Sequence, residues 1–193
     1  RCGIDRAAGQ VGPCGLKQTA FVAEHFVHIA EEPPINPSLV LNFRGCALRC
    51  LGCQQSALLD TRGAASEELS PALWAALDFT GARSLSFVGG NPDESLAAIL
   101  AFLAAAPRAF DVPVVWNNHA YMSEETIRLL DGVVDCYVPD LKFDDEACSR
   151  GYTHVEHYAE TAFRSVAALL ASGVPVIVRI LLMPGHASCC HLR

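Results

Sequence analysis

The chain has 193 residues, of which 51% are hydrophobic, and this length is sufficient for one domain with its own hydrophobic core. The formal net charge is −7 and Lys and Arg do not cluster, which excludes nucleic acid as an expected partner. The sequence contains no run of about 18 apolar residues, the length that crosses a bilayer, so a membrane partner is excluded as well.

Nine cysteines are many for a chain of this length. In a small secreted protein they would indicate disulfides, but long helix and strand patterns without an export signal favour a reducing compartment. We therefore expect a cytoplasmic protein whose cysteines bind metal or pack in the core. The chain starts at Arg1 and stops at Arg193, just after a Cys-Cys-His run, so we expect a fragment of a longer protein.

Short apolar runs and helical patterns alternate through most of the chain. Residues 1–37 are punctuated by Gly and Pro and are expected to be irregular. Strands are then predicted at 39–43, 84–88, 112–116, 133–138 and 174–182. Helices are predicted between them, at about 70–81, 93–106 and 157–172 and after residue 123, where Ser70, Asp93 and Ser123 would act as N-caps.

This alternation predicts an α/β fold with a parallel sheet and right-handed crossovers. The sheet would be an open doubly wound sheet or a barrel, full or partial, because periodicity does not distinguish these arrangements. We expect two parts, an irregular cysteine-bearing segment at 1–37 and a β/α domain at 38–193.

Polar residues gather at the ends of the predicted strands, where β/α folds carry their chemistry. They are Cys46, Cys50, Cys53, Gly89, Gly90, Asn91, Asn117, Asn118, His119, Asp140, Lys142, Arg179 and His186. An alternative is that loops collect polar residues in any fold. Five consecutive strand ends converging on one face nevertheless favour a single functional site.

The cysteines of the pattern Cys46-x3-Cys50-x2-Cys53 are the most specific local signal. Three soft ligands on one short loop suit an iron–sulfur cluster or zinc. Structural zinc usually has a closed set of four ligands, whereas three cysteines leave one iron of a cluster without a protein ligand. An alternative is three buried free cysteines.

The segment 43–54, FRGCALRCLGCQ, resembles the cluster loop of radical S-adenosylmethionine (SAM) enzymes, and GGNP at 89–92 is similar to their glycine-rich SAM motif. The segments 115–121, 140–142 and 178–185 are similar to the pyruvate formate-lyase-activating enzyme group. Uncharacterised iron–sulfur homologues of that group also resemble this chain in the EEPPI segment at 31–35 and in a cysteine-bearing N-terminal segment. The resemblance covers nearly the whole chain.

The resemblance implies a partial (β/α) barrel of the radical SAM type, with five of its six β/α units present. It implies a 4Fe-4S cluster on Cys46, Cys50 and Cys53, whose open iron chelates SAM. An electron from the cluster would cleave the sulfonium, and a 5′-deoxyadenosyl radical would then take a hydrogen atom from a substrate. A protein or peptide substrate, such as a glycyl radical enzyme, and a flavodoxin or ferredoxin as electron donor would be the partners.

The resemblance also suggests roles for the remaining polar residues. It places Gly89, Gly90 and Asn91 at the methionine part of SAM, Lys142 or Arg179 at its carboxylate, Asn117 and Asp140 near its sulfonium, and His119 and His186 at the same mouth. The family often has an acid at position 91, and Asn91 keeps a carbonyl acceptor for the SAM ammonium but loses the charge attraction. The family's acid at position 117 is also replaced by an amide, which argues against a cation site. As alternatives, the glycines form only a tight turn, and the two cations form ordinary salt bridges with a carboxylate such as Asp140.

A second function is compatible with the same residues, namely a non-catalytic iron–sulfur or zinc-binding protein. Cys2 and Cys14 resemble half of a four-ligand metal site. We expect them to bind no metal firmly in this chain and residues 1–15 to be poorly held. The alternative is a disulfide between them or with Cys189 or Cys190.

Overall fold

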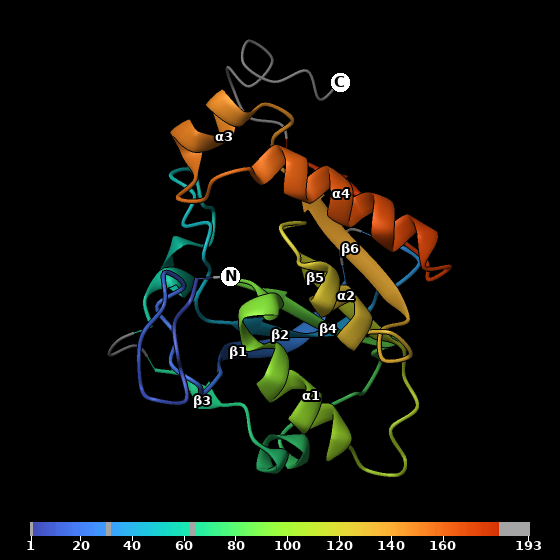
Figure 1. Cartoon of the computed structure of the whole chain (residues 1–193). Helices are drawn as coiled ribbons and strands as arrows, with labels where there is room; N and C mark the ends of the chain where they lie inside the picture. Colours follow the sequence, from blue (N-terminus) through green and yellow to red (C-terminus); the bar gives the residue numbers. More distant parts are fainter. Residues whose placement is uncertain (1, 30–31, 62–64, 182–193) are drawn as a thin grey trace.

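Five parallel strands form the centre of the fold, as predicted, in a computed structural model that describes residues 2–29, 32–61 and 65–181. They are β2 (Ser38–Phe43), β4 (Ser84–Gly89), β5 (Val114–Asn118), β6 (Cys136–Leu141) and β7 (Arg179–Ile180). Two antiparallel strands, β1 (Phe21–His28) and β3 (Glu67–Glu68), lie beyond β2. The order β3-β1-β2-β4-β5-β6-β7 does not close on itself, so the described residues form the predicted partial barrel (Figure 1). The strand predicted at 174–182 is wrong for residues 174–178, which form only an isolated bridge between Val176 and Tyr137 before β7 begins.

The strand β1 lies inside the segment that was predicted to be irregular, and that prediction is wrong for residues 21–28. The strand pairs with β2 so that Phe26 faces Val40 and His28 faces Ser38. Most of its residues are only half-buried or exposed, so charged and polar side chains interrupt the apolar alternation. Its register also shifts between Val22 and Glu24, which obscures the two-residue period further.

The helices follow the strands in the predicted order. They are α1 (Leu96–Ala104), α2 (Glu124–Leu129), α3 (Glu146–Tyr152) and α4 (Tyr158–Ala171), with short 3-10 helices at Ser56–Leu59, Pro71–Ala75 and Pro92–Ser95. The caps of two helices confirm the local chemistry of a helix start: Ser123 accepts the backbone N–H of Thr126, and Asp145 accepts that of Cys148. The helix α3 was not predicted.

The helix predicted at 70–81 is wrong beyond its first turn, because only Pro71–Ala75 is helical. The indole ring of Trp74 stacks on Phe102 with ring centroids 4.3 Å apart, and Phe79 stacks on the same indole at 6.3 Å. Residues five apart lie on different sides of an α-helix, so a continued helix would carry Phe79 away from that ring. The chain therefore turns after Ala75.

The helix predicted at 93–106 begins as a 3-10 turn, and Asp93 does not act as its N-cap. The carboxylate of Asp93 instead accepts a hydrogen bond from Nε1 of Trp116 at 2.7 Å. Burial raises the pKa of Asp93, against the lowering effect of His119. The residue is thus part of the contact between the glycine-rich turn and β5.

Two strands extend further towards their carboxyl ends than predicted, to residues 118 and 141. Asn117 and Asn118 pair with Val138 and Pro139, and Asp140 pairs with Arg179, so these polar residues lie within the strands. The prediction stopped each strand where its apolar run stops. The hydrogen bonds between parallel strands are made by the backbone, however. A strand can therefore continue through residues whose polar side chains point into the barrel.

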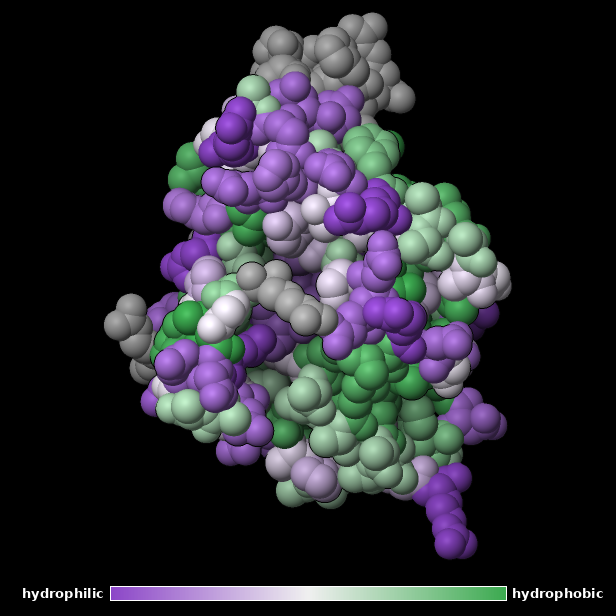
Figure 2. Space-filling view, in the orientation of Figure 1, coloured by the Kyte–Doolittle hydropathy of each residue, from purple (hydrophilic) through white to green (hydrophobic). Residues whose placement is uncertain are grey.

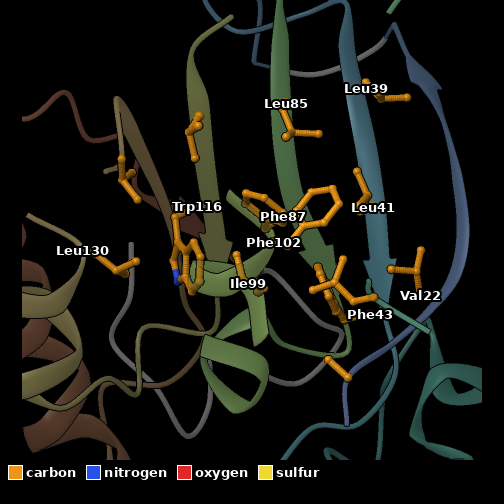
Figure 3. Packing of buried hydrophobic residues seen from close by; sticks show 14 of the residues in the cluster. Val22, Leu39, Leu41, Phe43, Leu85, Phe87, Ile99, Phe102, Trp116 and Leu130 are labelled. Carbon is orange, nitrogen blue, oxygen red and sulfur yellow. The ribbon is translucent and has the colours of Figure 1, made fainter. Parts of the chain in front are cut away.

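The main hydrophobic core lies between the sheet and the helices outside it (Figure 3). Phe43, Phe87 and Trp116 face this core from β2, β4 and β5, and Ile99 and Phe102 face it from α1. Because side chains alternate along a strand, the neighbouring positions point to the inside of the barrel. The core therefore fixes which residues of each strand line the interior.

Polar and apolar residues are distributed unevenly over the surface (Figure 2). The face shown is hydrophilic over α3 and more apolar over α1, whose exposed residues Ala97, Ala101 and Ala104 carry only a methyl group. Within the described ranges, no helix combines the length and the apolar character that a membrane span requires.

Candidate functional site

A cavity of about 330 Å³ opens at the carboxyl ends of the parallel strands. Nearly all the residues that the sequence singled out lie together in its lining, namely Cys46, Cys50, Cys53, Gly89, Gly90, Asn91, Asn117, Asn118, His119, Asp140, Lys142 and Arg179. His186 lies outside the described residues. The predicted convergence of strand ends on one face is therefore confirmed for the described residues.

The cysteine loop follows β2 and is held from both sides. The backbone N–H of Gly45 donates to the carbonyl of Leu58 at 2.9 Å, and His154 donates in the same way to Leu48 at 2.9 Å. The side chain of Leu48 is fully buried in a second hydrophobic cluster with Phe143. These contacts fix the loop on the mouth of the barrel, so that its three cysteines reach one cavity.

Arg44, at the start of this loop, is buried, and its guanidinium donates hydrogen bonds to backbone carbonyl groups. Its guanidinium donates to Ala57 and Asp60 at 3.0 Å and to Ala65 at 3.1 Å. The guanidinium of Arg44 thus binds three backbone carbonyl groups of the segment that follows the cysteine loop. Leu59 of this segment lines the cavity beside the cysteines.

Cys46 and Cys53 lie close enough to Cys50 to affect the ionisation of its thiol. Burial raises the pKa of the Cys50 thiol to about 11, against the lowering effect of Lys142 and with a further rise from Cys46 and Cys53. Three thiolates in one buried place are therefore unfavourable unless a cation compensates their charge. This donor set fits a thiolate-bound iron–sulfur cluster or zinc ion.

The glycine-rich turn after β4 packs directly on the cysteine loop. A Cβ atom on Gly90 would lie 2.3 Å from the carbonyl oxygen of Gly45 and 2.8 Å from that of Phe43. Gly89 has a φ of 73°, which is the left-handed region that favours glycine. Both glycines are thus required by the turn and its packing, which agrees with the tight-turn alternative, and both also line the cavity.

The sequence analysis missed Glu94, which joins three parts of the site. Its Oε1 atom accepts the backbone N–H of Ala47 at 2.7 Å and lies 3.5 Å from Nε2 of His119. Its other oxygen accepts from the side-chain amide of Asn91, whose own oxygen accepts the backbone N–H of His119. The sequence signal that could have identified Glu94 is an acidic residue three positions after Asn91. In the family motif, the acidic residue often comes directly after the two glycines.

The opposite wall of the cavity is a network of charges around Asp140. Arg179 donates to Asp140 at 2.6 Å, to Asn117 at 3.0 Å and to Glu32 at 3.1 Å, and Nζ of Lys142 lies 2.9 Å from Asp140. Burial alone would raise the pKa of Asp140, but Lys142 and Arg179 outweigh it and hold that pKa below its usual value. Both cations are thus paired with Asp140, as the salt-bridge alternative predicted, and Glu32 was missed.

Tyr158 was also missed, because it belongs to α4 and reaches the strand ends from outside the barrel. Its fully buried hydroxyl lies 2.9 Å from the carbonyl oxygen of His119 and 3.0 Å from that of Asp140, and it accepts the backbone N–H of Lys142 at 3.0 Å. Burial raises the pKa of this hydroxyl, so it remains a neutral hydrogen-bonding group. Tyr158 therefore holds the ends of β5 and β6 together.

The N-terminal segment contacts the site through Arg6, which donates to the backbone carbonyl of Glu94 at 2.6 Å. The prediction that residues 1–15 are poorly held is thus wrong at Arg6, and also at Cys14, which is buried. Cys2 and Cys14 are free thiols on either side of Gly12, so the predicted alternative of a disulfide between them is wrong. Cys189 and Cys190 lie outside the described residues.

Comparison with known proteins identifies the family of this chain. The model of the radical SAM superfamily matches residues 41–188, which is more than half of the chain. The chain belongs to the radical SAM superfamily. The match begins within β2 and includes the cysteine loop, the glycine-rich turn and the Asp140 network.

One curated relative of this radical SAM chain is the uncharacterized protein MJ0674 of Methanocaldococcus jannaschii, which is 31% identical over 200 residues. The match covers 98% of this chain but only 57% of the relative, so the chain spans little more than half of that protein's length. Among solved structures, "Native anSMEcpe with bound AdoMet and Kp18Cys peptide" is 12% identical with a TM-score of 0.49, covering 73% of this chain and 42% of that one. The structure with a Cp18Cys peptide is 13% identical with a TM-score of 0.48, covering 69% and 39%.

Membership of the superfamily implies SAM and an iron–sulfur cluster, and the residues present fit both. Cys46, Cys50 and Cys53 provide three thiols in one cavity, and the cavity wall facing SAM would combine backbone from Gly89 and Gly90 with the charges around Asp140.

Proposed function

We propose that this protein binds a 4Fe-4S cluster through Cys46, Cys50 and Cys53, cleaves SAM reductively and removes a hydrogen atom from a substrate. The observation that carries the proposal is the convergence of the three cysteines on the same cavity as the glycine-rich turn and the Asp140 network. This convergence occurs in a chain of the radical SAM superfamily. Since the chain spans 57% of its relative, the activity is proposed for the whole protein.

Different residues of the chain would bind different parts of SAM in such a site. When bound, the cluster supplies an open iron for the amino and carboxylate groups of SAM and the electron for its cleavage. The turn at Gly89 and Gly90 offers backbone to the methionine part, while Lys142 and Arg179 offer positive charge to its carboxylate. The apolar cluster around Leu48 and Phe143 excludes water behind the cysteine loop.

The decisive experiment measures SAM cleavage. The full-length protein is reconstituted anaerobically with iron and sulfide, reduced with dithionite and incubated with SAM, and 5′-deoxyadenosine is quantified by chromatography. We expect product to form only when reductant and cluster are both present. A protein that binds iron or zinc stoichiometrically but gives no 5′-deoxyadenosine would be the non-catalytic metal protein that is the alternative.

Replacing Lys142 with Ala is expected to weaken SAM binding by about 1–3 kcal/mol, the range for a hydrogen bond to a charged group. The side chain of Lys142 lines the cavity and is largely buried, so its charge is little screened there. Calorimetric titration of the cluster-loaded protein with SAM measures the change. Lys17→Ala is the matched control, because Lys17 is exposed and lies outside this cavity.

Replacing Arg179, the other cation paired with Asp140, with Ala is tested by the same calorimetric titration with SAM. It also removes a donor from Asp140, Glu32 and Asn117, so a weaker affinity is expected together with a less ordered cavity wall. Unchanged SAM affinity in both variants would show that the carboxylate binds elsewhere.

The subtype, the partners and the compartment remain predictions. The resemblance to the pyruvate formate-lyase-activating group predicts a glycyl radical enzyme as protein substrate and a flavodoxin or ferredoxin as electron donor, in the cytoplasm. Incubating the reduced protein and SAM with candidate glycyl radical enzymes, and recording the glycyl radical by EPR, tests the subtype directly.

A further inference from the structure

The imidazole of His119 has an unsatisfied polar atom beside the cysteine loop. Its side chain is only 6% exposed, and its Nε2 atom is buried without a hydrogen-bond partner among the described residues. A buried polar atom without a partner is costly, of the order of 1–3 kcal/mol, so such atoms in native proteins require an explanation. His119 also lines the cavity, which places this atom at the candidate site.

The hydrogen bond at the other ring nitrogen determines the tautomer of His119. The backbone N–H of Tyr121 lies 3.2 Å from Nδ1 of His119, and a backbone N–H can only donate. Nδ1 must therefore carry the lone pair, and in the neutral ring the proton is on Nε2. The unsatisfied atom is thus a donor that needs an acceptor.

Two acceptors lie near this donor. The sulfur of Cys46, a carboxylate oxygen of Glu94 and a ring nitrogen of His119 all lie within 4.8 Å of one another. Oε1 of Glu94 is 3.5 Å from Nε2, but it already accepts the backbone N–H of Ala47 at 2.7 Å, and the other oxygen accepts from Asn91. The Cys46 sulfur becomes a charged acceptor once it ligates iron, whereas the carboxylate already has two donors.

We infer that His119 is a positioning residue that donates its Nε2 proton to the sulfur of Cys46 when that sulfur ligates the cluster, and that it thereby raises the cluster's reduction potential. The inference rests on the proposed function, since it requires a cluster on Cys46. The reduced cluster carries one more negative charge than the oxidised one, so a hydrogen bond to its sulfur stabilises the reduced form more. Glu94 accepts the backbone N–H of Ala47 in the cysteine loop, and Asn91, which is hydrogen-bonded to Glu94, accepts the backbone N–H of His119, so the two residues connect the loop to the segment that carries the ring.

The reduction potential of the reconstituted cluster tests this inference without relying on activity. In His119→Leu, which removes the donor, an EPR-monitored redox titration should give a more negative midpoint. A tenfold lower ratio of reduced to oxidised cluster at a fixed potential corresponds to about 59 mV for a one-electron couple. His119→Gln, which can present an amide donor, should restore part of the difference.

A second measurement on the wild-type protein avoids the risk that His119→Leu assembles no cluster. With 15N-labelled histidine, pulsed EPR of the reduced cluster should detect a hyperfine coupling to a ring nitrogen that His119→Gln lacks. An unchanged midpoint in a cluster-loaded His119→Leu protein overturns the inference, as does an absent nitrogen coupling, which would favour donation to Glu94. A wild-type protein that forms no cluster at all overturns the proposed function and this inference with it.

Discussion

Replacing Cys50 with Ala is expected to abolish cluster binding. Cys50 is one of three thiols that line the cavity, and burial raises the pKa of its thiol to about 11. Two remaining cysteines do not complete the set of thiolates that a 4Fe-4S cluster needs. After anaerobic reconstitution, the variant should lack the brown colour, the visible absorbance and the bound iron of the wild type, and it should form no 5′-deoxyadenosine. Cys46→Ala and Cys53→Ala should behave in the same way.

Cys136→Ala is the matched control for the cysteine variants. Cys136 is also a buried free cysteine, but it packs with Val115 and Val138 away from the lining of the cavity. Its variant should keep the full iron content and lose only the stability that a small buried side chain contributes. If Cys50→Ala retained as much iron as Cys136→Ala, the assignment of the cluster to this loop would be wrong.

Replacing Gly90 with Ala is expected to separate the glycine-rich turn from the cysteine loop. The added methyl group would lie 2.3 Å from the carbonyl oxygen of Gly45, and a backbone atom cannot move aside as a flexible side chain can. We expect the free energy of unfolding to fall by about 3 kcal/mol, the upper part of the usual range for overpacking. Urea denaturation of the metal-free protein measures this change.

The same substitution should also lower the iron content and the SAM affinity of the reconstituted protein, because the two loops that Gly90 joins both line the cavity. Gly151→Ala is the control, since the residue belongs to α3 and, among the residues that the structure describes, no atom outside its own helix backbone and chain neighbours lies within 4 Å of the new methyl group. Alanine favours a helix more than glycine does, so this variant should be at least as stable as the wild type. Equal stability and equal iron content in Gly90→Ala would refute the proposed packing of the two loops.

The sequence by itself determined the features that depend on local spacing. The three cysteines between residues 46 and 53 share one loop whatever the fold, so the metal-ligand hypothesis needed no structure. The alternation of apolar runs and helical patterns determined the five parallel strands, and parallel strands bring their carboxyl ends to one edge. This is why Cys46, Gly90 and Asp140 were expected in one place and line one cavity.

The tertiary structure decided which side chains support those residues. Glu94 holds the cysteine loop from 47 residues away, and Glu32 pairs with Arg179 across 147 residues of sequence. No periodicity or spacing encodes such contacts, because they depend on the direction in which each side chain points after the sheet has formed. Tertiary contacts also decided two elements that the sequence did not predict. The chain turns after Ala75 because Phe79 stacks on Trp74, and residues 21–28 form β1 because they pair with β2. In both places these contacts outweigh the secondary structure that the local sequence favours.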